Sequence, residues 1–118
     1  MSDRDKGALQ MIVKYCSDIE TGIEQHQVDY HKFLADATIR NGLSMALLQI
    51  GENVKKLSRE TRQRYNKIPW SMVAGMRDHF AHGYDVMKDD LIWEAAELDA
   101  PALKAYCLEI LQQTEVTP

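Results

Sequence analysis

The stretch GMRDHFAHGY gathers the side chains of this sequence that are best suited to chemistry. It places Arg77, Asp78, His79, His82 and Tyr84 within eight positions. An imidazole can give or take a proton near neutral pH, and a guanidinium presents a planar fork of donors that matches phosphate oxygens. Residues four apart share one face of a helix, so Asp78 can orient the imidazole of His82. These residue types suit proton transfer beside a bound phosphate.

The spacing of Arg77 and His82 limits how one helix could present them. Five residues apart, they are separated by roughly 140° around an ideal helix. Either the helix ends near His82, so that the chain bends, or a second subunit completes the site. Gly83 favours an ending there, because glycine is common just past a helix C-terminus.

The elements around this stretch must position it. Pro69 has the fixed φ that suits a helix start, and the helix that follows should turn an apolar face to the core. That face comprises Trp70, Val73, Ala74 and Met76. We predict that Trp70 is a core residue and not a stacking surface for a ligand.

Two long amphipathic helices are predicted over residues 5–25 and 36–56, because apolar residues recur there at spacings of three and four. The two stripes are Leu9, Ile12, Cys16, Ile19 and Ile23, and then Ile39, Leu43, Leu47, Ile50, Val54 and Leu57. Between them, Tyr30, Phe33 and Leu34 indicate a short helix. Gly42 and Gly51 lie inside the second long helix, where they mark either close approach of another backbone or a tolerated weakness.

The C-terminal third predicts two further helices. The first should begin at Asp89 or Asp90 and run to Leu98, with Leu91, Trp93, Ala95 and Leu98 on its apolar side. The second should restart at residues 99–101 and bury Leu103, Cys107, Ile110 and Leu111. No segment alternates with the period of a strand. We predict an all-α fold, an antiparallel bundle of about five helices, as a single domain over residues 1–118.

The charge distribution is uneven. The 118 residues include 14 basic and 18 acidic ones, which gives a net charge of −4 and no general attraction to nucleic acid. Residues 55–67 nevertheless contain six basic residues and one acidic residue. This block is either a solvated helix end or a phosphate-facing surface, and Lys55, Lys56 and Arg59 are its candidate RNA contacts.

Several classes of protein are not indicated. Cys16 and Cys107 fall in apolar helical patterns and are predicted to be reduced core residues. No apolar run approaches the length of a membrane span, and no signal peptide is recognisable, so a cytoplasmic protein is expected. His26 and His31 are predicted to be surface residues, and neither a metal site nor a cofactor is expected.

The pattern Arg77-x4-His82-x-Tyr84 resembles the R-x4-H-x-Y motif of HepT-like toxins, a branch of the HEPN ribonuclease superfamily. The resemblance extends along nearly the whole chain. It includes residues 37–41, 50–52, 57–58, 68–70 and 73–77, and Trp93. Two departures add negative charge near the motif: Asp78 stands where the family often has asparagine, and Asp85 where it often has an aromatic residue.

The resemblance implies a metal-independent endoribonuclease, the toxin of a type VII toxin–antitoxin system. It implies that Arg77 and His82 are catalytic, at a cleft between two copies of the chain. The spacing of the motif, and not the resemblance, makes Asp78 and His79 supporting candidates, with His79 either an auxiliary donor or merely exposed. The resemblance also implies that a small nucleotidyltransferase antitoxin blocks the toxin by transferring AMP to Tyr84. The resemblance further implies a structured polar position near the site, at which Arg40 and Glu52 would pair within the bundle. The alternative is that Glu52 is simply an exposed glutamate.

Two other classes of function stay open. The same bundle could hold a nucleotide or a partner protein without cleaving RNA, and the added charges of Asp78 and Asp85 favour that interpretation. A dimeric scaffold is the third possibility, but it leaves the clustering in the GMRDHFAHGY stretch unexplained.

Overall fold

The computed structural model describes residues 1–71, 73–74 and 89–115. Every regular element among these residues is a helix, which confirms the predicted all-α class. None of the described helices is long and apolar enough to cross a membrane.

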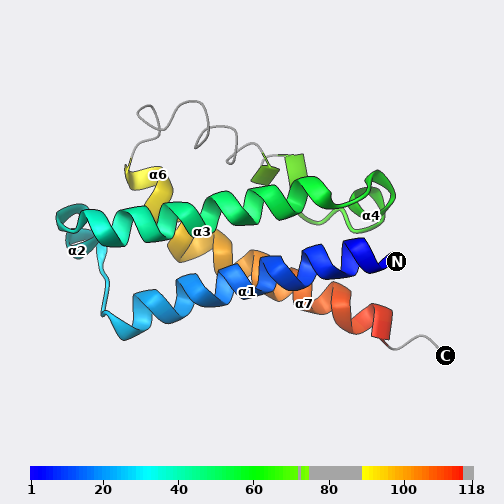
Figure 1. Ribbon diagram of the computed structural model, residues 1–118, viewed down its shortest axis with the longest axis horizontal. Helices are drawn as coiled ribbons and strands as arrows, with labels where there is room; N and C mark the ends of the chain where they lie inside the picture. The colour runs from blue at the N-terminus through cyan, green and yellow to red at the C-terminus, as the bar shows by residue number, and fades with distance from the viewer. Residues whose placement is uncertain (72, 75–88, 116–118) are drawn as a thin grey trace.

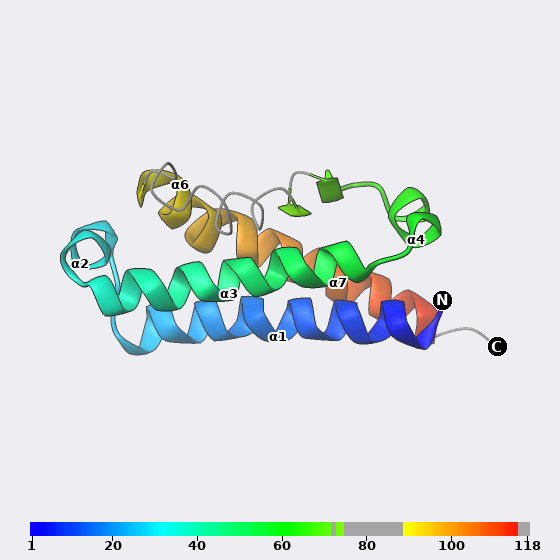
Figure 2. The same ribbon diagram turned by 45° about the horizontal axis from the view of Figure 1, so that its top comes forward.

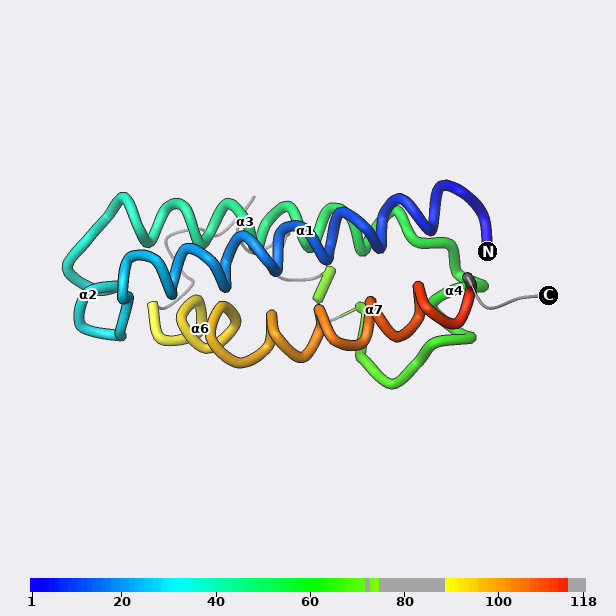
Figure 3. Tube along the Cα trace, turned by 90° about the horizontal axis from the view of Figure 1, so that it is seen from below, coloured from blue at the N-terminus to red at the C-terminus, as the bar shows by residue number. Residues whose placement is uncertain are grey.

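Three long helices form the body of the described part of the chain: α1 (Asp3–Gln25), α3 (Ala37–Lys56) and α7 (Ala100–Glu115). α1 packs against both α3 and α7 (Figure 1). Figure 3 shows that it runs antiparallel to the other two. The short helices α2 (Tyr30–Ala35) and α4 (Arg59–Arg64) lie at opposite ends of this bundle (Figure 2).

The apolar stripes of α1 and α3 account for their packing. All predicted members of both stripes are buried except Ile23 and Ile39, which are half-buried against the core. Burial of one such side chain is worth about 1.5–3 kcal/mol, so these two stripes supply much of the driving force for folding. Capping defines where the helices begin: Ser2 Oγ accepts from the Asp5 N–H, and Asp36 Oδ1 accepts from the N–H groups of Thr38 and Ile39.

Phe33 anchors the short helix α2 to the bundle. It is fully buried, and its ring lies 5.4 Å from that of Trp93 in a tilted arrangement. Arg40 Nη1 donates to the carbonyl oxygen of Phe33 at 3.2 Å and also to that of Leu34. The suggested pairing of Arg40 with Glu52 is wrong, because twelve residues of one helix separate them by about 18 Å.

The C-terminal helices differ from the prediction. α6 (Asp89–Glu94) continues through a π-helical turn, η2 (Ala95–Asp99), straight into α7, whereas a restart was expected. In η2 the N–H of Ala100 donates to the carbonyl oxygen of Ala95, five residues earlier. Pro101, which follows, lacks an N–H and would crowd the carbonyl four residues before it. Single π turns of this kind occur mostly inside longer α-helices, as η2 does between α6 and α7.

The buried face of this region also differs. Leu91 and Leu98 were expected in the core, but they are 50% and 61% exposed. The prediction is confirmed for Ala95, which is buried, and Trp93 is half-buried against the core. Ile92 and Ala96, which were not predicted, share the buried face with Ala95 at the i, i+3, i+4 spacing of a helix face. Farther along, the predicted burial of α7 is confirmed at Leu103, Cys107, Ile110 and Leu111.

Two smaller predictions are resolved. A Cβ added at Gly42 would meet no atom within 4 Å, so close approach of another backbone is wrong there. Cys16 and Cys107 are free and buried, as predicted, and burial raises the pKa of each thiol to about 12. Both thiols are therefore protonated at neutral pH and poor nucleophiles.

Candidate functional site

The motif residues Arg77, Asp78, His79, His82 and Tyr84 lie outside the described residues. The structure describes the two flanks from which this part of the chain departs and to which it returns. It also describes the basic block that precedes the first flank.

The N-terminal flank is fixed in the core through Trp70, which is 4% exposed. Its indole Nε1 donates to the carbonyl oxygen of Tyr65 at 2.5 Å, and its ring stacks on Tyr106 with centroids 6.0 Å apart. Ala74, one turn later, is also buried, and Val73 is half-buried. The prediction that Trp70 is a core residue is confirmed.

The C-terminal flank is fixed at the α2 end of the bundle. α6 contacts α2, where Ile92 is buried and Trp93 meets the rings of Phe33 and Tyr30. The motif is thus carried by a stretch of chain whose two ends are both held by aromatic packing.

The basic helix α4 is held in place by a buried carboxylate. Asp5, 2% exposed, accepts hydrogen bonds from the Ser58 N–H at 2.9 Å, Ser58 Oγ at 2.6 Å and Thr61 Oγ1 at 2.6 Å. Ser58 Oγ in turn caps α4 by accepting from the Thr61 N–H. Burial by itself would raise the pKa of Asp5, but the hydrogen bonds from Ser58 and Thr61 outweigh it and lower that pKa.

The sequence alone does not predict these hydrogen bonds to Asp5. In the sequence, Asp5 is one of two acidic residues in a first helical turn, and its partners lie more than fifty positions away. No local pattern links them. The three-residue separation of Ser58 and Thr61 indicates only a helix cap.

Within the basic block, three side chains are engaged by the protein itself. Arg62 donates from Nε to the Leu57 carbonyl oxygen at 3.2 Å and from Nη2 to that of Lys55 at 3.3 Å, which caps the C-terminus of α3. Lys67 Nζ lies 3.5 Å from a carboxylate oxygen of Glu109. The Arg64 guanidinium lies over the ring of Tyr65, 5.7 Å from its centroid.

The three predicted RNA contacts differ from these side chains in their exposure and in the partners that the protein gives them. Lys55, Lys56 and Arg59 are all exposed. Lys55 takes part in an interaction of its own. Within the described part of the chain, neither Lys56 nor Arg59 has a hydrogen bond or ion pair through its side chain, so both keep their charge available to a ligand.

Arg59 borders a cavity of about 480 Å³ beside the N-terminal flank. Its described lining is Arg59, Arg62 and Gln63 from α4, and Ile68, Trp70 and Ser71 from the following segment. We call this the α4 cavity. No acidic residue belongs to that lining. Glu60, the acid of the basic block, lines a different pocket of α4, together with Asp5.

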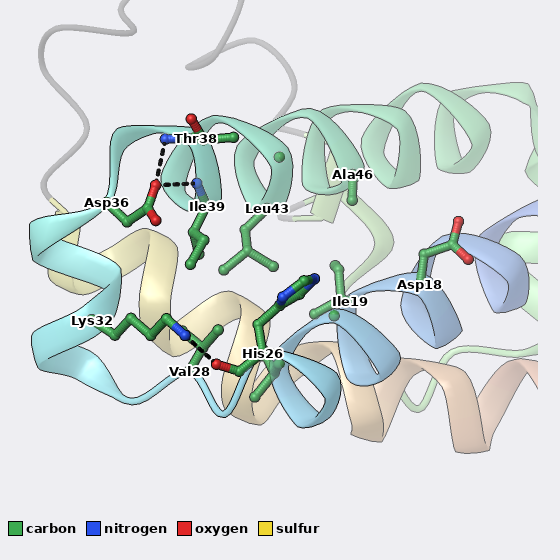
Figure 4. A pocket seen from close by; sticks show the side chains of 13 residues that line it. Asp18, Ile19, His26, Val28, Lys32, Asp36, Thr38, Ile39, Leu43 and Ala46 are labelled. Carbon is green, nitrogen blue, oxygen red and sulfur yellow. Dashed lines mark hydrogen bonds between the residues drawn. The ribbon is translucent and has the colours of Figure 1, made fainter.

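A second cavity, of about 490 Å³, lies at the other end of the bundle between α1, α2 and α3 (Figure 4). We call it the α2 groove. Its walls are mainly apolar and include Ile19, Leu43 and the two glycines Gly22 and Gly42. The imidazole of His26 points into it (Figure 4).

The polar groups of the α2 groove mostly serve the fold. The carboxylate of Asp36 caps α3, and Lys32 Nζ donates to the carbonyl oxygen of His26 (Figure 4). His26 and His31 are both exposed, as predicted. The described residues contain no group of three or more His, Cys, Asp or Glu that could hold a metal ion.

Comparison with known proteins identifies the class. A sequence model described as "Ribonuclease HepT-like" matches residues 7–110. "Putative RNase MJ0125" and "Putative RNase MJ1216" of Methanocaldococcus jannaschii are 33% and 32% identical over 116 residues, which is 98% of this chain and 98% and 94% of theirs. "Putative RNase TTE0752" of Caldanaerobacter subterraneus is 35% identical over 86 residues, 73% of this chain and 77% of its own. No solved structure matches.

The all-α fold and these relatives place the protein among the ribonucleases of HEPN type. More narrowly, the chain belongs to the ribonuclease HepT-like family.

Proposed function

We propose that this ribonuclease is a metal-independent endoribonuclease toxin of a type VII toxin–antitoxin system, and that it cleaves RNA through Arg77 and His82. The observation that carries the proposal is the Arg77-x4-His82-x-Tyr84 pattern in a chain that the family model matches over residues 7–110. The core-anchored flanks at Trp70 and Trp93 support it, because a reactive constellation needs a rigid frame.

The chemistry that these residues suit is transesterification within the RNA. The ribose 2′-oxygen loses its proton and bonds to the adjacent phosphorus, while the bond from phosphorus to the 5′-oxygen breaks and that oxygen gains a proton. The products are a 2′,3′-cyclic phosphate and a free 5′-hydroxyl. His82 serves as the base or the acid, and Arg77 stabilises the charge that builds on the phosphate oxygens.

A homodimer provides the second proton transfer. One motif contains one His82, whereas the reaction needs both a base and an acid. Two copies facing one cleft supply both groups and two copies of Arg77. Asp78 then orients His82, and His79 serves as an auxiliary donor.

Tyr84 is the proposed control point. A cognate minimal nucleotidyltransferase bonds the tyrosine oxygen to the α-phosphorus of ATP and releases pyrophosphate. The attached AMP places phosphate charge two residues from His82, which repels RNA and fills the cleft.

The test is induced expression of the wild type beside Arg77→Ala, His82→Ala and Tyr84→Phe, with growth and total RNA integrity as readouts. We expect arrest and RNA loss from the wild type, and neither from the first two variants. Tyr84→Phe should stay toxic when the transferase is co-expressed. His31→Ala, which removes an exposed histidine of the described surface, is the matched control.

A second candidate function has its own support. Asp78 and Asp85 add negative charge where phosphate would bind, which favours a module that holds a nucleotide or partner protein without cleaving RNA. A folded, dimeric wild type that neither arrests growth nor degrades RNA would reject the toxin and favour this module. Calorimetry with nucleotides would then test it directly.

A further inference from the structure

The α4 cavity has the composition of an anion site. Its volume of about 480 Å³ lies in the range of about 300–1,000 Å³ that is usual for small-molecule sites. Two arginines line it, and Gln63 and Ser71 add neutral polar groups. Guanidinium groups bind phosphate through paired, charge-assisted hydrogen bonds.

The two arginines of the cavity differ in burial and in hydrogen bonding. Arg62 is half-buried and held by its bonds to the end of α3, so its position is set before any ligand arrives. Arg59 is exposed, and the described residues offer its guanidinium no partner. A phosphate in the cavity would give Arg59 the counter-charge that the described residues do not provide.

The rest of the cavity suits a nucleotide more than a bare ion. Ile68 and the buried Trp70 contribute apolar surface beside the charged side. A ribose phosphate combines a charged group with a body that packs on such a surface. The cavity is also preformed, because the Asp5 bonds to Ser58 and Thr61 fix α4 from its opposite side.

The cavity is close to the motif along the chain. Ser71, in its lining, precedes Arg77 by six residues, and six residues of chain span at most about 20 Å. A short RNA segment can therefore reach from one to the other. A net charge of −4 makes such a local positive site necessary for holding RNA.

We propose that the α4 cavity is a subsite for a phosphate of the RNA substrate other than the one that is cleaved, with Arg59 as its principal contact. This inference rests on the proposed ribonuclease function. The subsite would position RNA from outside the catalytic motif. RNAs too short to reach it should therefore bind more weakly than longer ones.

The binding experiment uses the full-length protein and a single-stranded RNA of about ten nucleotides whose 2′-hydroxyls are methylated, so that it cannot be cleaved. Fluorescence anisotropy is measured across a range of salt concentrations. Arg59→Ala should weaken binding about tenfold and reduce the slope of log affinity against log salt by about 0.7 for each phosphate that is no longer neutralised. Arg59→Lys should recover part of the affinity.

Arg4→Ala is the matched control. Arg4 is exposed near the same end of the molecule, but it does not line the cavity. The Arg4→Ala substitution removes one positive charge from a residue that does not line the cavity. Thermal unfolding of all variants checks that each is folded. If Arg59→Ala binds the methylated RNA no more weakly than Arg4→Ala does, the subsite is rejected.

A cleavage experiment tests the same idea through substrate length. A dinucleoside monophosphate carries only the scissile phosphate, whereas a longer RNA carries others. Arg59→Ala should raise KM for the longer RNA about tenfold and affect the dinucleoside much less. Equal losses on both substrates would overturn the proposal.

The two proposals fail in different ways. A wild type that cleaves RNA while Arg59→Ala matches Arg4→Ala rejects the subsite and leaves the nuclease. A wild type that binds methylated RNA through Arg59 but cleaves no RNA supports the subsite and rejects the nuclease.

Discussion

The α2 groove and the α4 cavity have nearly equal volumes, about 490 and 480 Å³, but their linings differ in kind. The groove is walled by apolar side chains and two glycines, and its Asp36 and Lys32 already serve the fold. The cavity has two arginines, no acid in its described lining, and Ser71 at the start of the chain that leads to the motif. Size therefore does not distinguish the two cavities, whereas the charge of the described lining and its separation along the chain from the motif do.

The largest expected difference concerns histidines. His82→Ala should reduce RNA cleavage by about a hundredfold or more, because general acid–base catalysis typically contributes that much. His26→Ala, in the α2 groove, removes the same side chain type and should leave cleavage unchanged. Initial rates on a defined RNA are the measurement. Comparable losses of cleavage rate in His82→Ala and His26→Ala would show that the motif and the α2 groove do not differ in this respect.

A smaller effect is expected from the carboxylate that holds α4. Asp5→Asn keeps the shape of the side chain but replaces one acceptor oxygen by a donor facing the Ser58 and Thr61 hydroxyls. We expect a loss of about 2 kcal/mol in the free energy of unfolding, measured by urea denaturation. Asp3→Asn, in the same helical turn but exposed, should change little.

The Asp5→Asn variant also tests whether the position of α4 affects RNA binding at the α4 cavity. If Asp5 holds α4 in position, Asp5→Asn should weaken the binding of methylated RNA under conditions where the protein is still folded. Unchanged RNA affinity in a destabilised but folded Asp5→Asn protein would separate the two roles.

The pH dependence of stability follows from the same carboxylate. The pKa of Asp5 is lowered below its ordinary value of 3.8, so its contribution to stability is fully present above that value. The contribution is lost as pH falls through the lower pKa of the folded state. Denaturation from about pH 6 to about pH 2 should show the wild type losing more stability than Asp5→Asn. Parallel curves for the two proteins would contradict this assignment.

The smallest effect should come from filling the α2 groove. A Cβ added at Gly22 or Gly42 meets no atom within 4 Å, and alanine is favoured over glycine inside a helix by about 1 kcal/mol. Gly22→Ala and Gly42→Ala should therefore each stabilise the protein by up to that amount without changing RNA cleavage. Thermal unfolding and cleavage rates are the measurements. A loss of cleavage would assign the groove a role in the reaction.

Much of the fold was determined by the sequence alone. The stripes of α1 and α3 follow from apolar spacing, because a helix with one apolar face must bury that face. The cap at Asp36 and the core position of Trp70 were also predictable from local patterns. The motif and its family were identifiable for the same reason: they depend on residue types at short, fixed separations.

Tertiary structure decided the features that join distant parts of the chain. The hydrogen bonds from Ser58 and Thr61 to Asp5 bridge more than fifty positions, and no local pattern encodes them. The exposure of Leu91 depends on how α6 packs against its neighbours. Likewise, sequence shows six basic residues in one block, but only packing shows that Arg62 caps α3 while no described residue pairs with the side chain of Arg59. Charge is a property of the residue, whereas its availability depends on which carbonyl or carboxylate lies within reach.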